Sequence, residues 1–89
     1  MRRTFDCDPS KEAKLLAERR LSLRSMAAVF HDEKRIEFID TRADYGEERR
    51  VTIGQVRGKL FTVVYTMRGD VTWLITAWSS SRKERARYG

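Results

Sequence analysis

Three runs with strand-like composition, separated by two short turns, fill the second half of the chain. The turns, Arg57-Gly58 and Arg68-Gly69-Asp70, contain the glycine that tight connections favour, and they are too short to join anything but antiparallel neighbours. The middle run is apolar on both faces, which is typical of a central strand. The sequence therefore predicts an antiparallel meander with strands over residues 49–53, 60–66 and 71–78.

The first half of the chain adds a strand and two helices to this prediction. Residues 35–39 alternate apolar and charged side chains, as a strand with one wet face does. Asp8 and Pro9 have the composition of a helix start, and Ser22 is placed to cap a second helix. Residues 3–6 are compatible with a short edge strand.

A third helix is predicted at the end of the chain. Ser81 and Glu84 have the spacing of a capping box, which marks a helix start. Together the elements predict an α+β fold, an antiparallel sheet of about four strands with two N-terminal helices packed on it and a short C-terminal helix. The helices are expected over residues 9–20, 22–31 and from 81 onward.

Length and composition indicate one small domain. With 89 residues, 36% of them charged and 40% hydrophobic, the chain is near the size at which a single core can support a fold. Cys7 is the only cysteine, which excludes an internal disulfide and offers no metal-ligand cluster. No long apolar run indicates a signal peptide or a membrane span. We expect a single cytoplasmic domain over residues 1–89, without metal or cofactor.

The net charge of +6 is concentrated on the predicted sheet and last helix. Residues 49–89 contain nine Lys or Arg and two Asp or Glu, whereas residues 31–48 contain three and seven. A basic sheet of this kind suits a polyanion, although it also suits an acidic protein partner. No nucleotide-binding loop, metal-ligand spacing or Ser/Cys/His constellation supports small-molecule enzymology.

Short motifs along nearly the whole chain carry a more specific signal. They are Phe5-Asp6-Cys7-Asp8-Pro9 with Lys11, Ala28-Val29-Phe30 with Asp32, Gly46-Glu47-Glu48-Arg49 with Ile53-Gly54, Val63-Val64-Tyr65-Thr66 with Arg68-Gly69-Asp70, and Arg82-Lys83-Glu84-Arg85 with Tyr88.

In this order and spacing, the motifs resemble those of the BrnT-type toxins of bacterial type II toxin–antitoxin systems. The resemblance implies a RelE-like ribonuclease fold, RNA as substrate, and a cognate BrnA-like antitoxin with a ribbon-helix-helix DNA-binding domain. It also implies contact with operator DNA only through that antitoxin.

RNA cleavage without a metal needs attack of a 2′-hydroxyl on the neighbouring phosphate, with groups that move two protons and cations that stabilise the phosphoryl oxygens. Arginine suits the cationic role, so Arg49 and Arg68 are predicted as phosphate clamps. Glu84 or Glu48 is the candidate base and Tyr65 the candidate acid. Arg85 is predicted to assist catalysis, and further RNA contacts are expected from Arg50, Lys59, Arg82, Lys83 and Arg87.

The chain departs from the family pattern at places that leave a second function open. Trp78 stands where the family has an arginine at the end of the last strand, and the helical motif N-x-x-K-H-G is replaced by Leu15, Glu18, Arg19 and Arg20. The alternative is a catalytically weakened or inactive homologue that binds RNA or an antitoxin.

Several candidates also have ordinary structural explanations. The capping of Ser81 is enough to explain Glu84 without a catalytic role, and Tyr65 fits a core residue as well as a site residue. Trp73 and Trp78 are five residues apart, so a regular strand would place them on opposite faces.

Overall fold

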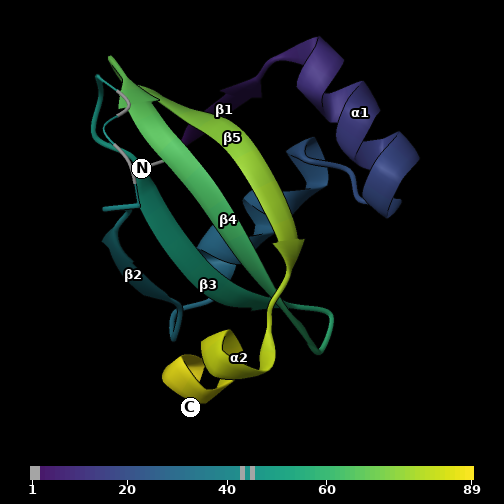
Figure 1. Cartoon of the computed structure of the whole chain (residues 1–89), viewed down its shortest axis with the longest axis vertical. Helices are drawn as coiled ribbons and strands as arrows, with labels where there is room; N and C mark the ends of the chain where they lie inside the picture. Colours follow the sequence, from purple (N-terminus) through teal and green to yellow (C-terminus); the bar gives the residue numbers. More distant parts are fainter. Residues whose placement is uncertain (1–2, 43, 45) are drawn as a thin grey trace.

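The computed structural model describes residues 3–42, 44 and 46–89. Its centre is a five-stranded sheet in the order β1-β5-β4-β3-β2 (Figure 1). The strands are β1 (Thr4–Cys7), β2 (Ile36–Ile39), β3 (Arg50–Val56), β4 (Lys59–Arg68) and β5 (Val71–Ser79), and the helices are α1 (Pro9–Arg19), the 3₁₀ helix η1 (Arg24–His31) and α2 (Arg82–Tyr88).

The prediction of an antiparallel sheet of about four strands is wrong, because the observed sheet has five strands and is mixed. Strands β2 to β5 form an antiparallel meander, but β1 adds a fifth strand that runs parallel to β5, with Thr4 opposite Val71 and Cys7 opposite Leu74. Residues 8–70 lie between these two strands, which gives the length that a parallel connection requires. Burial of Cys7, which is 2% exposed, holds β1 at this edge.

The prediction of two N-terminal α-helices is also wrong, because the second segment is a 3₁₀ helix. Three buried residues, Leu23, Met26 and Val29, are spaced by three. A helix with three residues per turn places such residues on a single face, so this winding buries all of them together. The first helix is α1, which begins at Pro9 with Asp8 as its N-cap and ends at Arg19.

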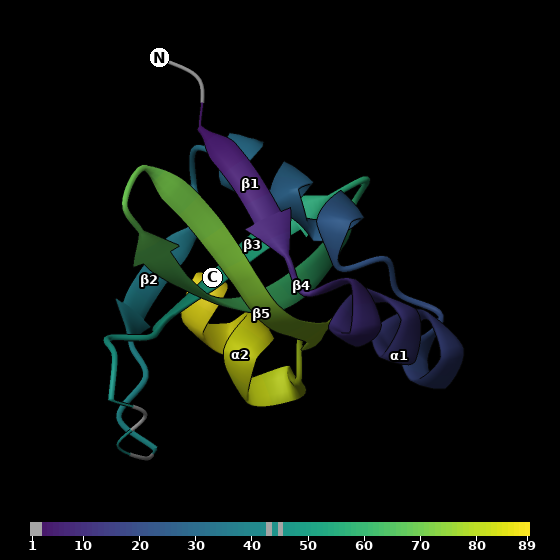
Figure 2. The same cartoon turned by 90° about the horizontal axis from the view of Figure 1, so that it is seen from above.

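The helices divide between the two faces of the sheet (Figure 2). Helix η1 packs on β3, β4, β5 and β1, and its buried side chains join Val63, Tyr65 and Leu74 in the core. Helix α2 lies on the opposite face, which we call the α2 face (Figures 1 and 2). In the described part of the chain, no helix is long and apolar enough to span a membrane.

A β-bulge in β5 changes which side chains share a face. Leu74 pairs with Tyr65 and Thr76 with Val64, so Ile75 is an extra residue in the ladder. One inserted residue reverses the alternation beyond it. The expectation that Trp73 and Trp78 lie on opposite faces is therefore wrong, because both now project from the α2 face.

Helix α2 is attached to the rest of the fold at both ends. Its start is the predicted capping box, with Ser81 accepting a hydrogen bond from the Glu84 amide and Glu84 accepting one from the Ser81 amide. At its end, the Tyr88 hydroxyl donates to Asp32, which also accepts a hydrogen bond from the Gln55 amide at 2.8 Å. The pKa of Asp32 is lowered, and the hydrogen bond from Tyr88 is the largest cause.

Replacement of Tyr88 by phenylalanine is expected to loosen α2 without unfolding the sheet. The substitution removes the hydroxyl that bonds Asp32 and leaves the ring in place. Hydrogen exchange should therefore become faster at the amides of residues 84–88, while the amides of β3 and β4 keep their protection.

Low pH should also loosen α2 in the unsubstituted chain. Because the Asp32 pKa is lowered in the fold, its contribution is present above the ordinary value of 3.8 and is lost as the pH falls through the lowered pKa. Equal exchange rates at residues 84–88 in both chains at pH 7 would contradict the role given to Tyr88.

Candidate functional site

Three aromatic rings of the α2 face each contact an arginine. The guanidinium carbon of Arg87 lies 4.0 Å from the centre of the Phe38 ring, and that of Arg68 lies 4.4 Å from the Trp73 ring. Arg42 lies 5.6 Å from the Trp78 ring, the longest of the three distances. Strands β2, β4 and β5, helix α2 and the segment after β2 all contribute to this surface. Stacked arginines and aromatic rings suit a ligand with both phosphates and planar groups.

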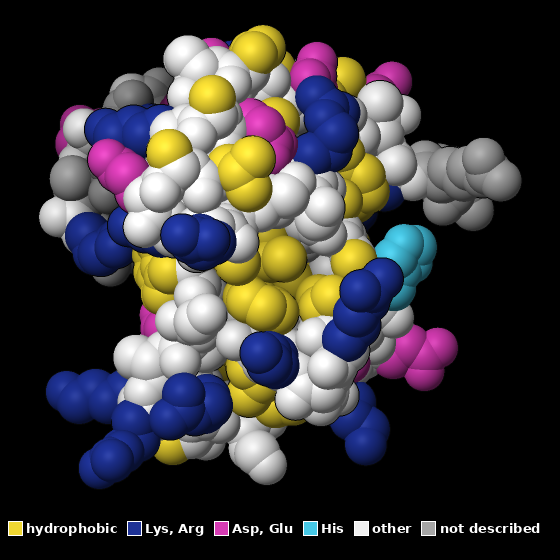
Figure 3. Space-filling model, turned by 90° about the vertical axis from the view of Figure 1, so that its right-hand side faces the viewer, with side chains coloured by type: hydrophobic (Ala, Val, Ile, Leu, Met, Phe, Trp, Pro, Cys, Tyr) yellow, Lys and Arg dark blue, Asp and Glu magenta, His cyan; other side chains and the backbone are white. Residues whose placement is uncertain are grey.

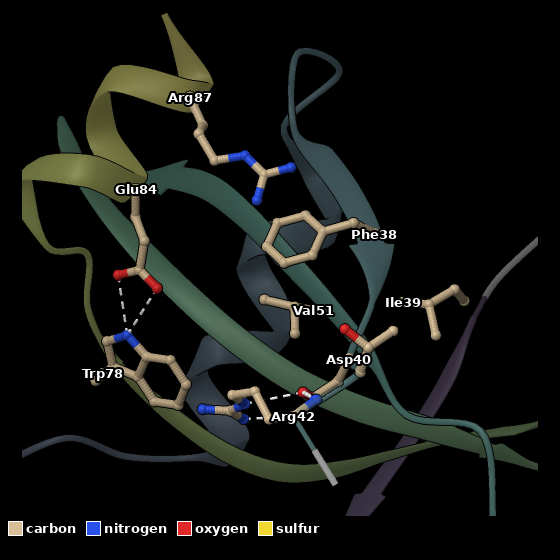
Figure 4. Close-up of a pocket in the computed structure, with 9 residues that line it drawn as sticks. Phe38, Ile39, Asp40, Arg42, Val51, Trp78, Glu84 and Arg87 are labelled. Atoms are coloured by element: carbon tan, nitrogen blue, oxygen red, sulfur yellow. Dashed lines mark hydrogen bonds and ion pairs between the residues drawn. The ribbon is translucent and has the colours of Figure 1, made fainter.

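A hollow of about 250 Å³ lies beside α2 on this face. Figure 4 shows Trp78 on one side of it and Phe38 on the other, with Val51 between them. Arg42 and Arg87 border the hollow, which also has two carboxylates among its lining residues. Its full lining is Phe38, Ile39, Asp40, Thr41, Arg42, Val51, Trp78, Glu84 and Arg87.

Both carboxylates in the hollow are held by hydrogen bonds. Asp40 has a side chain only 1% exposed, and Arg42 donates to its two oxygens at 2.8 Å each. Glu84 accepts hydrogen bonds from the Trp78 indole N–H at 3.0 and 3.2 Å (Figure 4). Burial acts to raise the pKa of Glu84, but hydrogen bonds from Ser81 and Trp78 outweigh burial, and the pKa is lowered overall. The carboxyl group is therefore ionised and weakly basic.

The two predicted phosphate clamps meet at a single carboxylate. Arg49 Nε lies 3.7 Å from one oxygen of Glu47, and Arg68 lies 3.9 Å from the other. Arg68 reaches this position from the end of β4, where its guanidinium also covers Trp73. The structure therefore brings Arg49 and Arg68 together, as a pair of cations that share one anionic neighbour.

Tyr65 and Arg50 lie on the other face of the sheet, the one that η1 covers. Tyr65 is 2% exposed, and its hydroxyl donates to Glu37, which also pairs with Arg35 and Arg50. Burial and the Glu37 carboxylate raise the pKa of the Tyr65 hydroxyl. Since this cluster is separated from Arg49 and Arg68 by the sheet, the structure does not bring the candidate acid to the candidate clamps. Glu48, the second candidate base, pairs with Arg50.

The remaining candidate cations are spread over the surface. Arg82, Lys83 and Arg85 are exposed on α2, and Arg85 donates to the Ser80 carbonyl at 2.9 Å. Lys59 lies at the β3–β4 turn, beside an apolar hollow that also contains Met26, Val56, Arg57 and Phe61. Figure 3 shows the flank where apolar side chains gather within a border of lysines and arginines.

Arg42, Asp40, Phe38 and Trp73 belong to the α2 face but are absent from the predicted site. Arg42 stands in a loop whose net charge is acidic, so charge counting does not select it. Arg42 follows β2 and contacts Trp78 of β5, although β3 and β4 lie between these two strands in the sheet. A regular strand predicts Trp73 and Trp78 on opposite faces, and the bulge in β5 places both on the α2 face.

In the described residues, no group of His, Cys, Asp and Glu side chains is arranged to hold a metal ion. The chemistry that the α2 face can offer comes from guanidinium groups, two fixed carboxylates and aromatic rings.

A comparison with known proteins identifies the family. Residues 7–84 match the family model described as the ribonuclease toxin BrnT of type II toxin–antitoxin systems. The search of curated proteins found no significant match. Because the matched segment covers most of the 89 residues, this chain belongs to the BrnT family of ribonuclease toxins, whose type II systems pair each toxin with an antitoxin.

Proposed function

We propose that this chain is an endoribonuclease toxin that cuts RNA on the α2 face without a metal ion, by attack of a 2′-hydroxyl on its neighbouring phosphate. The observation that carries the proposal is the bulge in β5, which gathers Trp73 and Trp78 on the face that also presents Arg42, Arg68 and Arg87. Aromatic rings that stack on bases, interleaved with cations that contact phosphates, are the usual equipment for binding single-stranded RNA.

In this proposal Arg49 and Arg68 stabilise the phosphoryl oxygens as negative charge develops on them. Their shared neighbour Glu47 holds both guanidinium groups at one place before RNA arrives. Glu84 is ionised and accepts the proton of the attacking 2′-hydroxyl through water. Water is needed because Glu84 lies beside Trp78, opposite Thr62, whereas Arg68 covers Trp73, opposite Thr66. The bond from phosphorus to the 5′-oxygen then breaks, and the 5′-oxygen takes a proton from water. The lowered pKa of Glu84 makes it a weak base, so we expect slow chemistry.

We further propose that the antitoxin is a BrnA-like ribbon-helix-helix protein that neutralises the toxin by covering the α2 face. The α2 face presents Arg42, Arg49, Arg68 and Arg87, so an acidic segment of the antitoxin would compete with RNA for these arginines. Operator DNA would then be contacted by the antitoxin and not by this chain.

Incubation of the purified chain with labelled single-stranded RNA in EDTA tests the proposed function. We expect fragments with 2′,3′-cyclic phosphate ends, and no cutting of the same sequence with 2′-O-methyl groups, which lack the attacking proton. Intact RNA after prolonged incubation, or cutting that requires added Mg²⁺, would overturn the proposal.

The interaction between Trp78 and Glu84 favours a second candidate, an RNA-binding module with little catalysis. Glu84 is engaged by the indole N–H as well as by the helix cap, which weakens it as a base. Under this alternative, the chain binds RNA in the same assay without cutting it, and cleavage emerges only after Trp78→Arg.

A further inference from the structure

The hollow beside Trp78 has features that the proposed cleavage chemistry does not use. It is concave, with a volume of about 250 Å³, and aromatic rings stand on two of its sides (Figure 4). Val51, on the floor between them, is 5% exposed. A hollow with an apolar floor and planar walls suits a flat ring system more than it suits a phosphate.

The charges of the hollow point the same way. Asp40 and Glu84 line it together with Arg42 and Arg87, so the lining carries two negative and two positive charges and is neutral overall. Arg42 pairs with Asp40 at 2.8 Å, but its side chain is 60% exposed, so its guanidinium group also faces the solvent at the edge of the hollow. A lining that is neutral overall suits an uncharged inserted group, and the guanidinium groups of Arg42 and Arg87 can contact the phosphates on either side of it.

Trp78 is better placed to stack on such a group than Trp73. Arg68 covers the Trp73 ring at 4.4 Å, whereas Arg42 lies 5.6 Å from the Trp78 ring and is turned toward Asp40. Hydrogen bonds from the indole N–H to Glu84 hold the Trp78 ring in position. The ring is thus fixed before any ligand arrives, which lowers the entropic cost of stacking.

From this arrangement we propose that the hollow is a subsite for one unpaired nucleobase of the RNA. The base stacks on Trp78, and the adjoining phosphates contact Arg42 and Arg87. The proposal rests on the proposed function for its ligand class, because it takes the bound polymer to be RNA. It goes beyond that function by placing one base in a defined hollow, between the rings of Trp78 and Phe38, with Arg42 and Arg87 for the adjoining phosphates.

Fluorescence of Trp78 in a Trp73→Phe chain tests the subsite, because Trp78 is then the only tryptophan. The probe is a 2′-O-methyl oligoribonucleotide, which binds but is not cut. We expect saturable quenching, and no quenching by an abasic oligomer of the same length, which offers phosphates without bases. Unchanged Trp78 fluorescence at saturation, with binding measured independently by the anisotropy of a dye on the oligomer, would overturn the proposal.

Affinity gives a second, independent measurement. Trp78→Leu is expected to weaken binding of the 2′-O-methyl oligomer about 10-fold, as loss of one stacked base does, whereas Trp78→Phe should retain most of the affinity. Thermal unfolding of each variant shows whether it is folded. Equal affinities for the native chain and a folded Trp78→Leu chain would also refute the subsite.

These binding measurements need no turnover, so they separate the two proposals. Quenching by the oligomer in a chain that never cuts RNA would reject the ribonuclease proposal and leave the subsite standing. Cleavage of RNA by a chain whose Trp78 signal never changes would do the reverse.

Discussion

Replacement of Arg49 by alanine is expected to slow RNA cleavage about 100-fold, the usual cost of losing one group that stabilises transition-state charge. Arg68→Ala should have a comparable effect, because the two arginines converge on Glu47 and serve the same phosphate in the proposed mechanism. The measurement is the single-turnover rate on labelled RNA, which reports the chemical step separately from binding.

Lys14→Ala provides the matched control. It removes one positive charge from an exposed position of α1, away from the α2 face, and should leave the single-turnover rate unchanged. If Lys14→Ala and Arg49→Ala slow cleavage equally, net charge and not position governs the rate, and Arg49 loses its assigned role.

Glu47→Gln is expected to strengthen RNA binding, whereas loss of Arg49 or Arg68 weakens the action of the site on RNA. The substitution of Glu47 removes the carboxylate that both arginines face, so RNA binding should tighten and its salt dependence should steepen. An RNA affinity that falls in this variant would show that Glu47 positions the arginines more than it competes with RNA for them.

Replacement of Gly54 by alanine is expected to destabilise the fold by about 1–3 kcal/mol, the usual cost of an overpacked core. A Cβ at this position of β3 would lie 2.7 Å from a methyl group of Val29 and 3.1 Å from the Val29 carbonyl oxygen. Glycine at position 54 therefore lets η1 approach the sheet closely. Urea denaturation followed by circular dichroism measures the loss, which is a large part of the few kcal/mol that stabilise a domain of this size.

A double variant separates this clash from the intrinsic effect of removing a glycine. Val29→Ala deletes the methyl group at 2.7 Å, so Gly54→Ala should cost less in that background than in the native chain. Strictly additive losses of stability would show that the contact with Val29 is not the source of the effect.

Features carried by neighbouring residues could be predicted from the sequence. The Asp8 cap, the Ser81–Glu84 capping box and the β3–β4–β5 meander depend on spacings within a few residues, and the structure contains them all. The family is also readable from the order of short motifs, and the match over residues 7–84 confirms it.

Contacts between distant residues were decided only by the tertiary structure. The parallel pairing of β1 with β5 depends on which edge buries Cys7, and no local pattern encodes that choice. The 3₁₀ winding of η1 is favoured because Leu23, Met26 and Val29 are buried together against the sheet.

The candidate site shows the same division most clearly. The sequence determined that arginines and tryptophans are abundant near the end of the chain, since this is a matter of composition. Which of them share a surface was decided by one inserted residue, Ile75, because a bulge reverses the alternation of side chains along the rest of its strand. That reversal joins Trp73 to Trp78, while the pairing of β3 with β4 places Tyr65 on the opposite face, beneath η1.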